Sequence, residues 1–452
     1  MEPIVALATP PGLGAIALVR LSGDGVFSIS DKVIQGRISP SRAKPRRVYR
    51  AVVVDPETGD EIDDVLFWTF HSPHSYTGED MVEVSTHGGI TVSNMVLQAF
   101  LKAGARLAQR GEFTKRAFLN GKLDLIEARA VLDLIEARTE RGVKLARRKL
   151  DGWVSRRLEA INDRLLELAK DIEASINFEE DVGDVEVESI KNRLREIIDE
   201  LMRFIEEGKS GRAYLFGAKV AIVGRPNVGK STLFNAILGR RRAIVTEVPG
   251  TTRDVVSEEI IIGGIPVKLM DTAGLRETED VVERIGVEFA LRTVEESDLA
   301  LLVVDATQRE FDDEVEFLSS IEVPVIIVVN KLDLTGGQLP ELPAEFLSHR
   351  VVAISAETGE GLDRLLDSVS DMLHEIFNPE SGFALSDHEL NRALGAMLEL
   401  DQGLKRLEEG FPIDIASHHI LRATSSLSEL LGMGPVEEEI LDRIFSDFCI
   451  GK

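Results

Sequence analysis

The sequence predicts a multidomain protein of mixed α/β and α class, with an α/β domain inserted into a helical bundle that follows another α/β domain. Short apolar runs ending in polar or glycine-rich turns mark residues 211–377, and long helical periodicity marks residues 119–210 and 378–452. Residues 1–118 mix strand-like and helix-like segments. We expect the two helical segments to form one bundle; two unrelated helical pieces are the alternative.

The N-terminal α/β segment contains four runs that read as strands, separated by Pro and Gly: 4–7, 15–19, 51–54 and 65–70. In the helical segment, Leu-Asp-Leu-Ile-Glu-Ala-Arg occurs at 123–129 and again at 132–138. A nine-residue offset turns half a circle on a helix, so we expect one helix with apolar residues on both sides, buried in the bundle.

Two short stretches predict connections between elements. Residues 178–184 are acidic and predict a turn between antiparallel helices, and residues 208–211 predict a linker into the inserted domain.

One stretch of the helical segment, residues 141–157, is strongly basic. Its cations form either a solvated helix face or a patch for RNA or a partner: Arg141, Lys144, Arg147, Arg148, Lys149, Arg156 and Arg157.

Residues 224–231, Gly-Arg-Pro-Asn-Val-Gly-Lys-Ser, predict a phosphate site, because they follow the apolar run 220–223 and precede an amphipathic stretch. Backbone N–H groups at the start of a helix bind a triphosphate without competing side-chain bulk. Lys230 would reach the β- and γ-phosphates, and the Ser231 hydroxyl would hold Mg²⁺. The chain is therefore expected to bind a nucleoside triphosphate.

A second motif predicts guanine as the base. The apolar run 325–329 ends in Asn330-Lys331-Leu-Asp333, and a carboxylate there can accept two hydrogen bonds from the N1–H and 2-amino edge of guanine. Adenine lacks that pair of donors and would leave the acid unpaired. The run 351–354 leads into Ser355-Ala356, which is expected to offer a backbone N–H to the guanine O6.

The third motif concerns the metal and the γ-phosphate. The strand expected at 267–270 places Asp271 near the metal, and the backbone N–H of Gly274 can lie close to the γ-phosphate. Leu275 stands where many GTPases have a glutamine that orients water, so either hydrolysis is very slow or another group positions the water.

Composition restricts the cellular compartment and the binding partners that we expect for the chain. The single Cys among 452 residues predicts no disulfide framework, and the absence of a signal-like start or a long apolar run predicts a cytoplasmic protein without a membrane span. A net charge of −26 argues against nucleic-acid binding by the whole surface.

The motifs together resemble the MnmE (TrmE) family of tRNA-modification GTPases over the whole chain. They comprise residues 111–122, 224–231, 250–254, 271–276, 330–333 and the terminus Phe448-Cys-Ile-Gly-Lys452. The resemblance implies a Ras-like G domain, an N-terminal domain similar to the folate-binding domain of the glycine-cleavage T-protein, and a constitutive homodimer formed through that domain.

For the G domain, the resemblance implies K⁺-assisted hydrolysis when two G domains pair transiently across their nucleotide faces. K⁺ would be surrounded by Asn227, Thr246, Val248 and Thr251, and Mg²⁺ by Ser231 and Thr252. Glu283 would orient the water, so that Glu283, Lys230 and Thr252 form the catalytic set. The full GTP-contact set would be Asn227, Val228, Gly229, Lys230, Ser231, Thr232, Thr246, Thr252, Asp271, Gly274, Asn330, Lys331, Asp333, Ser355 and Ala356.

For the N-terminal domain, the resemblance implies binding of a 5-formyl-tetrahydrofolate-type one-carbon donor. Glu83 would read the pterin edge, and Arg20, Lys122 and Lys452 would complete the folate site. The C-terminal tail would be flexible and lie near that site, with Cys449 either a nucleophile at the modification centre or a structural thiol.

The implied activity is formation of a carboxymethylaminomethyl or aminomethyl group at C5 of the wobble uridine of tRNA. An MnmG (GidA)-type partner carrying FAD would form a heterotetramer or larger complex with the chain. A ribosome-assembly GTPase switch is the alternative, although neither a second G domain nor an RNA-binding module is recognisable after residue 378. A folate-binding scaffold with a vestigial G domain conflicts with the intact phosphate and metal residues.

Overall fold

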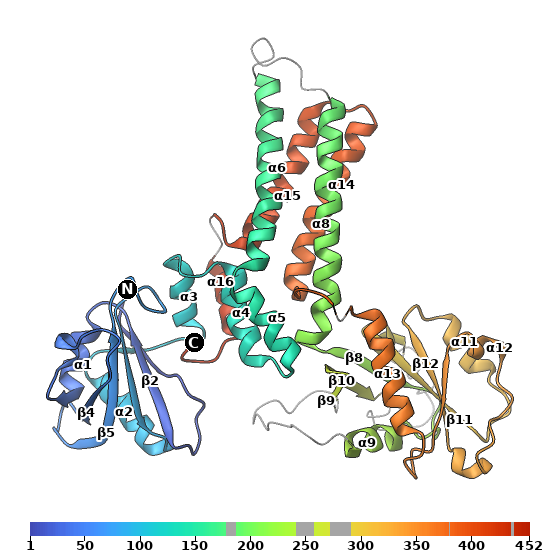
Figure 1. The fold of residues 1–452 in the computed structure, drawn as a ribbon, viewed down its shortest axis with the longest axis horizontal. Coiled ribbons are helices and arrows are strands. Elements are labelled where there is room, and N and C mark those ends of the chain that lie inside the picture. The colour runs from blue at the N-terminus through green and yellow to red at the C-terminus, as the bar shows by residue number, and fades with distance from the viewer. Residues whose placement is uncertain (178–186, 241–256, 272–290, 379, 435–437) are drawn as a thin grey trace, which may run out of the picture. The chain divides into compact units, whose positions relative to one another are not determined.

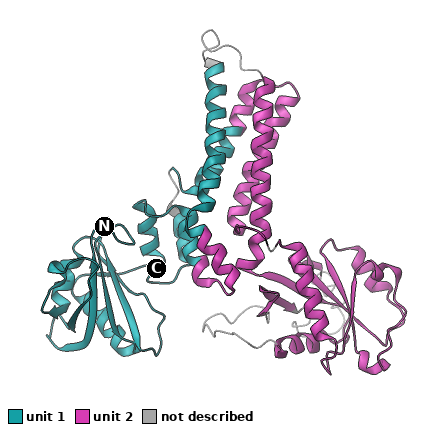
Figure 2. Cartoon of the chain, viewed as in Figure 1, with its two compact units in different colours: residues 1–132, 149–177, 420–452 teal, residues 133–148, 178–419 magenta. Residues whose placement is uncertain are grey.

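The structure is a computed structural model that describes residues 1–177, 187–240, 257–271, 291–378, 380–434 and 438–452 (Figure 1). Its residues form two compact units (Figure 2). Unit 1 comprises residues 1–132, 149–177 and 420–452, and unit 2 comprises residues 133–148 and 178–419. None of the described helices has the length and apolar composition needed to cross a membrane.

Unit 1 begins with a seven-stranded sheet in the order β3-β4-β5-β6-β2-β1-β7. Every neighbouring pair is antiparallel except β1 and β7. The strands are β1 (Ile4–Leu7), β2 (Ile16–Ser22), β3 (Ile34–Gly36), β4 (Tyr49–Val54), β5 (Glu61–Phe70), β6 (Met81–His87) and β7 (Arg106–Leu107). The four strand-like runs of the N-terminal segment are thereby confirmed.

One face of this sheet is covered by α1 (Val26–Val33) and α2 (Ile90–Lys102). Val19, Leu21, Val82 and Val84 point into that core together with Phe67. Because successive strand residues point to opposite faces, the residues between them project from the other face of the sheet. That other face carries the polar side chains of the site described below.

The remaining helices of unit 1 come from distant parts of the chain. They include α3 (Glu112–Leu119), α6 (Trp153–Asn177), α16 (Glu438–Ser446) and the first part of α4 (Leu125–Glu136). Leu125 and Ala128 share an apolar cluster with Leu441, Phe445 and Phe448. Residues before and after the inserted domain therefore share one core in unit 1.

Unit 2 contains a six-stranded sheet in the order β13-β12-β11-β8-β10-β9. The strands are β8 (Ala218–Val223), β9 (Ser257–Ile262), β10 (Ile265–Asp271), β11 (Leu299–Asp305), β12 (Val325–Asn330) and β13 (Arg350–Ala353). All neighbours are parallel except β9 and β10. Strands β8, β11 and β12 are buried almost throughout, as their continuous apolar sequences predict.

Helices cover both faces of this sheet, which has a separate apolar cluster on each side. The elements are α9 (Lys230–Arg240), α11 (Asp312–Ser319), η2 (Leu332–Thr335), α12 (Ala344–Leu347) and α13 (Leu362–Ile376). The expected α/β class of this part of the chain is confirmed.

The helical part of unit 2 contains helices that precede this sheet in the sequence and helices that follow it. Helix α8 (Val187–Phe216) packs along α14 (Asp387–Glu408), and Arg212 forms a 2.7 Å ion pair with Asp387. Helices α5 (Glu140–Leu150) and α15 (Ile413–Leu431) belong partly to each unit.

The linker prediction for residues 208–211 is wrong, because they lie inside α8. A Cβ on Gly208 would meet Leu385 Cγ at 2.4 Å, and one on Gly211 would meet the Phe383 carbonyl oxygen at 1.9 Å. The glycines therefore permit close packing against the residues before α14.

The prediction that both heptapeptide copies lie in one helix is largely confirmed by α4, but the prediction that this helix is buried on both sides is wrong. Helix α4 ends at Glu136, inside the second copy, and Ile135 is half exposed. Leu125 and Ala128 of the first copy are buried. The acidic stretch 178–184 lies outside the described residues.

Candidate functional site

The carboxyl ends of the parallel strands in unit 2 bring three sequence motifs to one edge of the sheet. Gly224 follows β8, Asn330 ends β12, and Ser355 comes shortly after β13. The register pairs Asp305 at the end of β11 with Asn330. This edge is where open α/β sheets bind their ligands.

The loop between β8 and α9 has a conformation that depends on glycine. Gly224 has φ +142° and a Cβ there would lie 2.2 Å from the Val303 carbonyl oxygen; Gly229 has φ +97° and a Cβ there would lie 2.3 Å from Asn330 Nδ2. Asn227 also lies in the left-handed region. Lys230 folds over the loop, and its Nζ donates to the carbonyls of Gly224 and Arg225 at 2.8 Å each.

Asn330 connects this loop to the segment after β13. Its amide nitrogen donates to the Val228 carbonyl at 2.9 Å, and its amide oxygen accepts from the Ala356 N–H at 2.9 Å. The Ser355 N–H donates to the Glu360 carbonyl. Because both N–H groups expected to meet the guanine O6 have partners, either would need to share its hydrogen between two acceptors.

The other two residues of the base motif differ in their surroundings. Lys331 Nζ lies 2.7 Å from Asp305 Oδ2. Burial raises the pKa of Asp305, but the hydrogen bonds from Lys331 and Thr307 outweigh it and lower that pKa overall. The Asp333 carboxylate is exposed and has no hydrogen-bond or ion-pair partner within the described part of the chain, so it is free to accept from a ligand.

Several predicted residues of the nucleotide site cannot be placed. Thr246, Val248, Thr251, Thr252, Gly274 and Glu283 lie outside the described residues. Asp271 is the last residue of β10, and only its backbone is described. Ser231 and Thr232 are exposed in the first turn of α9, and Val228 is buried in the loop before it.

The predicted folate residues lie on the open face of the N-terminal sheet. Strand register places Glu83 of β6 opposite Arg20 of β2 on one side and opposite Trp68 of β5 on the other. Arg20 Nε donates to Glu83 Oε1 and Trp68 Nε1 donates to Glu83 Oε2, each at 2.7 Å. Glu83 is 8% exposed, so both contacts form in a largely dehydrated setting.

Arg20 and Glu83 border a cavity of about 500 Å³ within unit 1. All four predicted folate residues line it: Arg20, Glu83, Lys122 and Lys452. The other lining residues had no predicted role in a site: Arg46, Phe70, His74, Ser75, Tyr76, Met81 and Val131. The Lys122 ammonium donates to the Pro73 carbonyl at 3.1 Å. The cavity thus combines cations, one carboxylate and aromatic surface.

The C-terminal tail reaches this cavity through backbone contacts with the first turn of α3 and the loop before it. The Phe113 N–H donates to the Lys452 carbonyl at 3.1 Å, and Arg110 pairs with Ile450 as a β-bridge. Gly451, at φ +97°, lies so close to β1 that a Cβ would be 2.5 Å from the Leu7 carbonyl oxygen. The tail is therefore docked, and Lys452 lines the cavity while Cys449 is exposed.

Lys452 has an unusual electrostatic setting. Burial, followed by repulsion from Arg20, lowers its pKa, and Glu83 and Cys449 only partly offset this. A negatively charged ligand in the cavity would favour the protonated ammonium.

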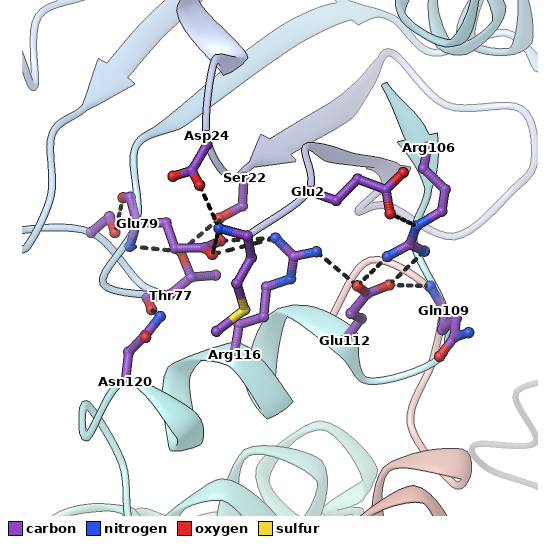
Figure 3. Close-up of polar contacts among 12 residues, drawn as sticks. Glu2, Ser22, Asp24, Thr77, Glu79, Arg106, Gln109, Glu112, Arg116 and Asn120 are labelled. Atoms are coloured by element: carbon purple, nitrogen blue, oxygen red, sulfur yellow. Dashed lines mark hydrogen bonds and ion pairs between the residues drawn. The ribbon is translucent and has the colours of Figure 1, made fainter. Parts of the chain in front are cut away.

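A buried ionic network fixes the loop that forms one wall of the cavity (Figure 3). Arg116 of α3 is 4% exposed and contacts Glu79 at 3.1 Å and Glu112 at 2.9 Å. Glu79 also accepts from Ser22, and Asn120 donates to the Thr77 carbonyl. Because Ser75 and Tyr76 of the same loop line the cavity, this network positions the wall.

Sequence reasoning missed two residues that line the cavity, Tyr76 and Arg46, and also Trp68, which donates to the cavity residue Glu83. Trp68 occupies an alternate position in the predicted strand 65–70, but its pairing with Glu83 depends on register. Tyr76 lies in a loop, donates to or accepts from Thr114 at 2.8 Å, and has a pKa raised by burial. Arg46 lies in a basic run that had no predicted role.

A mainly parallel sheet with a glycine-rich loop before a helix, and with Asn-Lys-x-Asp after another strand at the same edge, defines a P-loop GTP-binding protein. Residues 3–122 match the family described as the N-terminus of the GTP-binding protein TrmE. Residues 125–449 match the MnmE helical domain. The chain therefore belongs to the MnmE family of tRNA modification GTPases.

Curated relatives match the chain from end to end. The tRNA modification GTPase MnmE of Moorella thermoacetica is 43% identical over all of this chain and 99% of its own length. Those of Aquifex aeolicus and Thermotoga maritima are 42% and 41% identical, over 100% of both chains. A solved structure of a variant of Aquifex aeolicus Era, bound to GDP and AlF4⁻, is 32% identical over 40% of this chain and 67% of its own, with a TM-score of 0.27, too low to bear on the fold.

Proposed function

We propose that this GTPase forms the 5-carboxymethylaminomethyl or aminomethyl group on the wobble uridine of tRNA, in the cytoplasm. The observation that carries this is the 41–43% identity, over the whole length of the chain, to proteins named for tRNA modification. An FAD-dependent partner of the MnmG (GidA) type would join the chain in a heterotetramer or larger complex. The chain itself would dimerise through residues 1–118 and pair its G domains, residues 211–377, transiently.

In the proposed nucleotide site, the glycine-dependent loop before α9 would receive the phosphates on backbone N–H groups. The positive φ values of Gly224, Asn227 and Gly229 support this, because they curve the loop as phosphate binding requires. Lys230 would move from its two carbonyl partners to the phosphates, and the Ser231 hydroxyl would hold Mg²⁺. Asp333 would accept from the guanine edge.

The proposed cation set fits the described residues only in part. Asn227 is exposed on the phosphate loop and offers an amide oxygen to K⁺, whereas Thr246, Val248, Thr251, Thr252 and Glu283 remain predictions from the resemblance. K⁺, when bound, would neutralise charge that develops between the β- and γ-phosphates.

Replacing K⁺ by Na⁺ tests this assignment. GTP turnover should fall sharply while nucleotide affinity stays nearly unchanged, since the phosphate loop and Asp333 do not depend on K⁺. Equal turnover in the two salts would refute it.

In the proposed folate site, the cavity of unit 1 would take a 5-formyl-tetrahydrofolate-type donor. Its volume of about 500 Å³ and its mixture of cations, carboxylate and aromatic rings suit a pterin with a negatively charged tail. Arg20, Lys122 and Lys452 would hold the carboxylates of the tail. Glu83 would accept from the pterin with lone pairs that Arg20 and Trp68 leave open.

Mass spectrometry of wobble nucleosides tests the whole proposal. The chain would be incubated with unmodified tRNA, GTP, 5-formyl-tetrahydrofolate and the FAD-dependent partner, and each component would be omitted in turn. The modified uridine should form only in the complete mixture. Normal GTP turnover without any modified uridine would instead favour the ribosome-assembly switch.

A further inference from the structure

Residues 32–54 of the N-terminal domain form a cationic segment in an otherwise acidic protein. It contains Lys32, Arg37, Arg42, Lys44, Arg46, Arg47 and Arg50, and no acidic residue separates Asp31 from Asp55. Since 78 of the 452 residues are acidic, a stretch of 23 residues would be expected to hold about four. The segment is therefore a local reversal of the chain's net charge of −26.

The backbone of the segment is fixed at several points between β3, at the edge of the sheet, and β4. Pro40 and Ala43 are buried, and the Ser41 N–H donates to Asp31 at 2.9 Å. The Arg46 N–H donates to the Thr69 carbonyl at the end of β5 at 2.9 Å. Binding an anion here would therefore require little ordering of the chain.

The cations of the segment are mostly unneutralised. Arg50 pairs with Asp64 at 3.2 Å, and Lys32 donates to the Ala103 carbonyl. Four further cations are exposed, and their side chains have no hydrogen-bond or ion-pair partner in the described part of the chain: Arg37, Arg42, Lys44 and Arg47. The carboxylate of Asp31, just before the segment, accepts from the Ser41 backbone rather than from a cation.

The segment continues into the cavity described above. Arg46 lines that cavity, and its guanidinium donates to the carbonyl of His74, another lining residue, at 3.2 Å. Arg20, Lys122 and Lys452 line the same cavity. Positive charge therefore extends from the sheet edge to the cavity.

We propose that the cationic segment binds the phosphate backbone of tRNA and brings the target nucleotide towards the cavity. This inference rests on the proposed function. A chain of net charge −26 repels a polyanion over most of its surface, so binding must be confined to a local cationic region. Guanidinium groups without carboxylate partners suit phosphate, because they can donate two parallel hydrogen bonds to it.

A triple variant, Arg42→Gln/Lys44→Gln/Arg47→Gln, tests the inference in the full-length chain. The matched control, Lys170→Gln/Arg309→Gln/Lys405→Gln, removes the same charge from three exposed cations elsewhere. Binding of an unmodified tRNA transcript would be measured by fluorescence anisotropy across a range of KCl concentrations. Thermal unfolding and GTP turnover of both variants should match the wild-type chain, because the altered side chains are exposed.

The triple variant should bind tRNA at least about tenfold more weakly near 0.1 M salt, with a salt dependence shallower by about two to three in log–log slope. The control should bind as the wild-type chain does. Equal weakening in both variants would show an effect of net charge alone and overturn the inference. Unchanged tRNA binding with loss of affinity only for polyglutamylated folate would overturn it in favour of a folate-tail site.

The same measurements separate this inference from the proposed function. If the wild-type chain neither binds tRNA nor yields modified uridine in the complete mixture, both fail. If the wild-type chain modifies tRNA and the triple variant does so equally well at limiting tRNA, only the role of the cationic segment fails.

Discussion

Arg20 and Glu83, paired across β2 and β6, form a 2.7 Å ion pair on the open face of the N-terminal sheet. Trp68 engages the second oxygen of Glu83 at the same distance. A carboxylate has about four lone-pair sites, so Glu83 can still accept from a ligand. It also holds Arg20 in one orientation at the cavity.

Glu83→Ala should weaken binding of 5-formyl-tetrahydrofolate by about tenfold or more, because a hydrogen bond to a charged group contributes roughly 1.5–3 kcal/mol. GTP turnover should be unchanged. Isothermal titration calorimetry measures the affinity, and Glu61→Ala, at an exposed carboxylate of β5, is the control. Unchanged or tighter binding would mean that Glu83 only positions Arg20.

The affinity of the cavity for folate should fall as the pH rises through the lowered pKa of Lys452. Burial and Arg20 cause that shift, so the ammonium loses its proton at a lower pH than an ordinary lysine, near 10.4. Below that pKa, the charged ammonium attracts the folate carboxylates. Titrations from neutral pH to about pH 10 should show the fall in the wild-type chain but not in Lys452→Met. The same pH profile in both would contradict the assignment.

Gly451→Ala should undock the C-terminal tail. The added Cβ would lie 2.5 Å from the Leu7 carbonyl oxygen, at a backbone φ of +97° that L-residues rarely adopt. The Phe113 N–H, which donates to the Lys452 carbonyl, should then exchange faster with deuterium. Gly12→Ala, where a Cβ meets nothing within 4 Å, is the control. Equal protection of Phe113 in all three proteins would show that the tail tolerates a side chain.

Arg116→Met should destabilise unit 1 by about 3–5 kcal/mol, because it leaves Glu79, 9% exposed, without its main cationic partner. Arg106→Met removes a cation that is 37% exposed and should cost about 1 kcal/mol or less. Chemical denaturation followed by tryptophan fluorescence compares the two, since Trp68 and Trp153 both lie in unit 1. Similar losses in both variants would refute the special role of the buried network.

Asp333→Ala should remove the discrimination between GTP and ITP, which lacks the 2-amino group of guanine. The exposed carboxylate of Asp333 is the proposed acceptor for that group, so the wild-type chain should prefer GTP by about 10- to 100-fold. Competition binding with fluorescent GDP measures both ligands. A preference that survives in the variant would assign guanine recognition to another group.

The sequence predicted the conformation of the phosphate loop from local geometry alone. Residues 224–231 include glycines needed for positive φ, and they follow a continuous apolar strand, β8. Neither signal needs knowledge of the rest of the chain. The two N–H groups of Ser355 and Ala356, in contrast, are engaged by Glu360 and Asn330, which the sequence did not indicate.

Two predictions failed in the helical segment, one about a linker and one about burial. Gly208 and Gly211 suggested a linker because glycine weakens helices, but in α8 they allow the contact with Phe383 and Leu385. In α8, packing partners distant in the sequence therefore outweighed local preference. The second heptapeptide copy suggested burial on both sides of one helix, but Ile135 of α4 is half exposed.

By itself, the sequence determined four strands of the unit 2 sheet (β8, β10, β12 and β13), the phosphate loop and membership of a GTPase family, since these depend on periodicity and on residues close together in the chain. Only the tertiary structure decided that Glu83 lies between Arg20 and Trp68, and that Lys452 and Arg46 border the same cavity. Strand register and the docking of the tail bring together residues up to 432 positions apart, from Arg20 to Lys452, and no local pattern specifies such pairings.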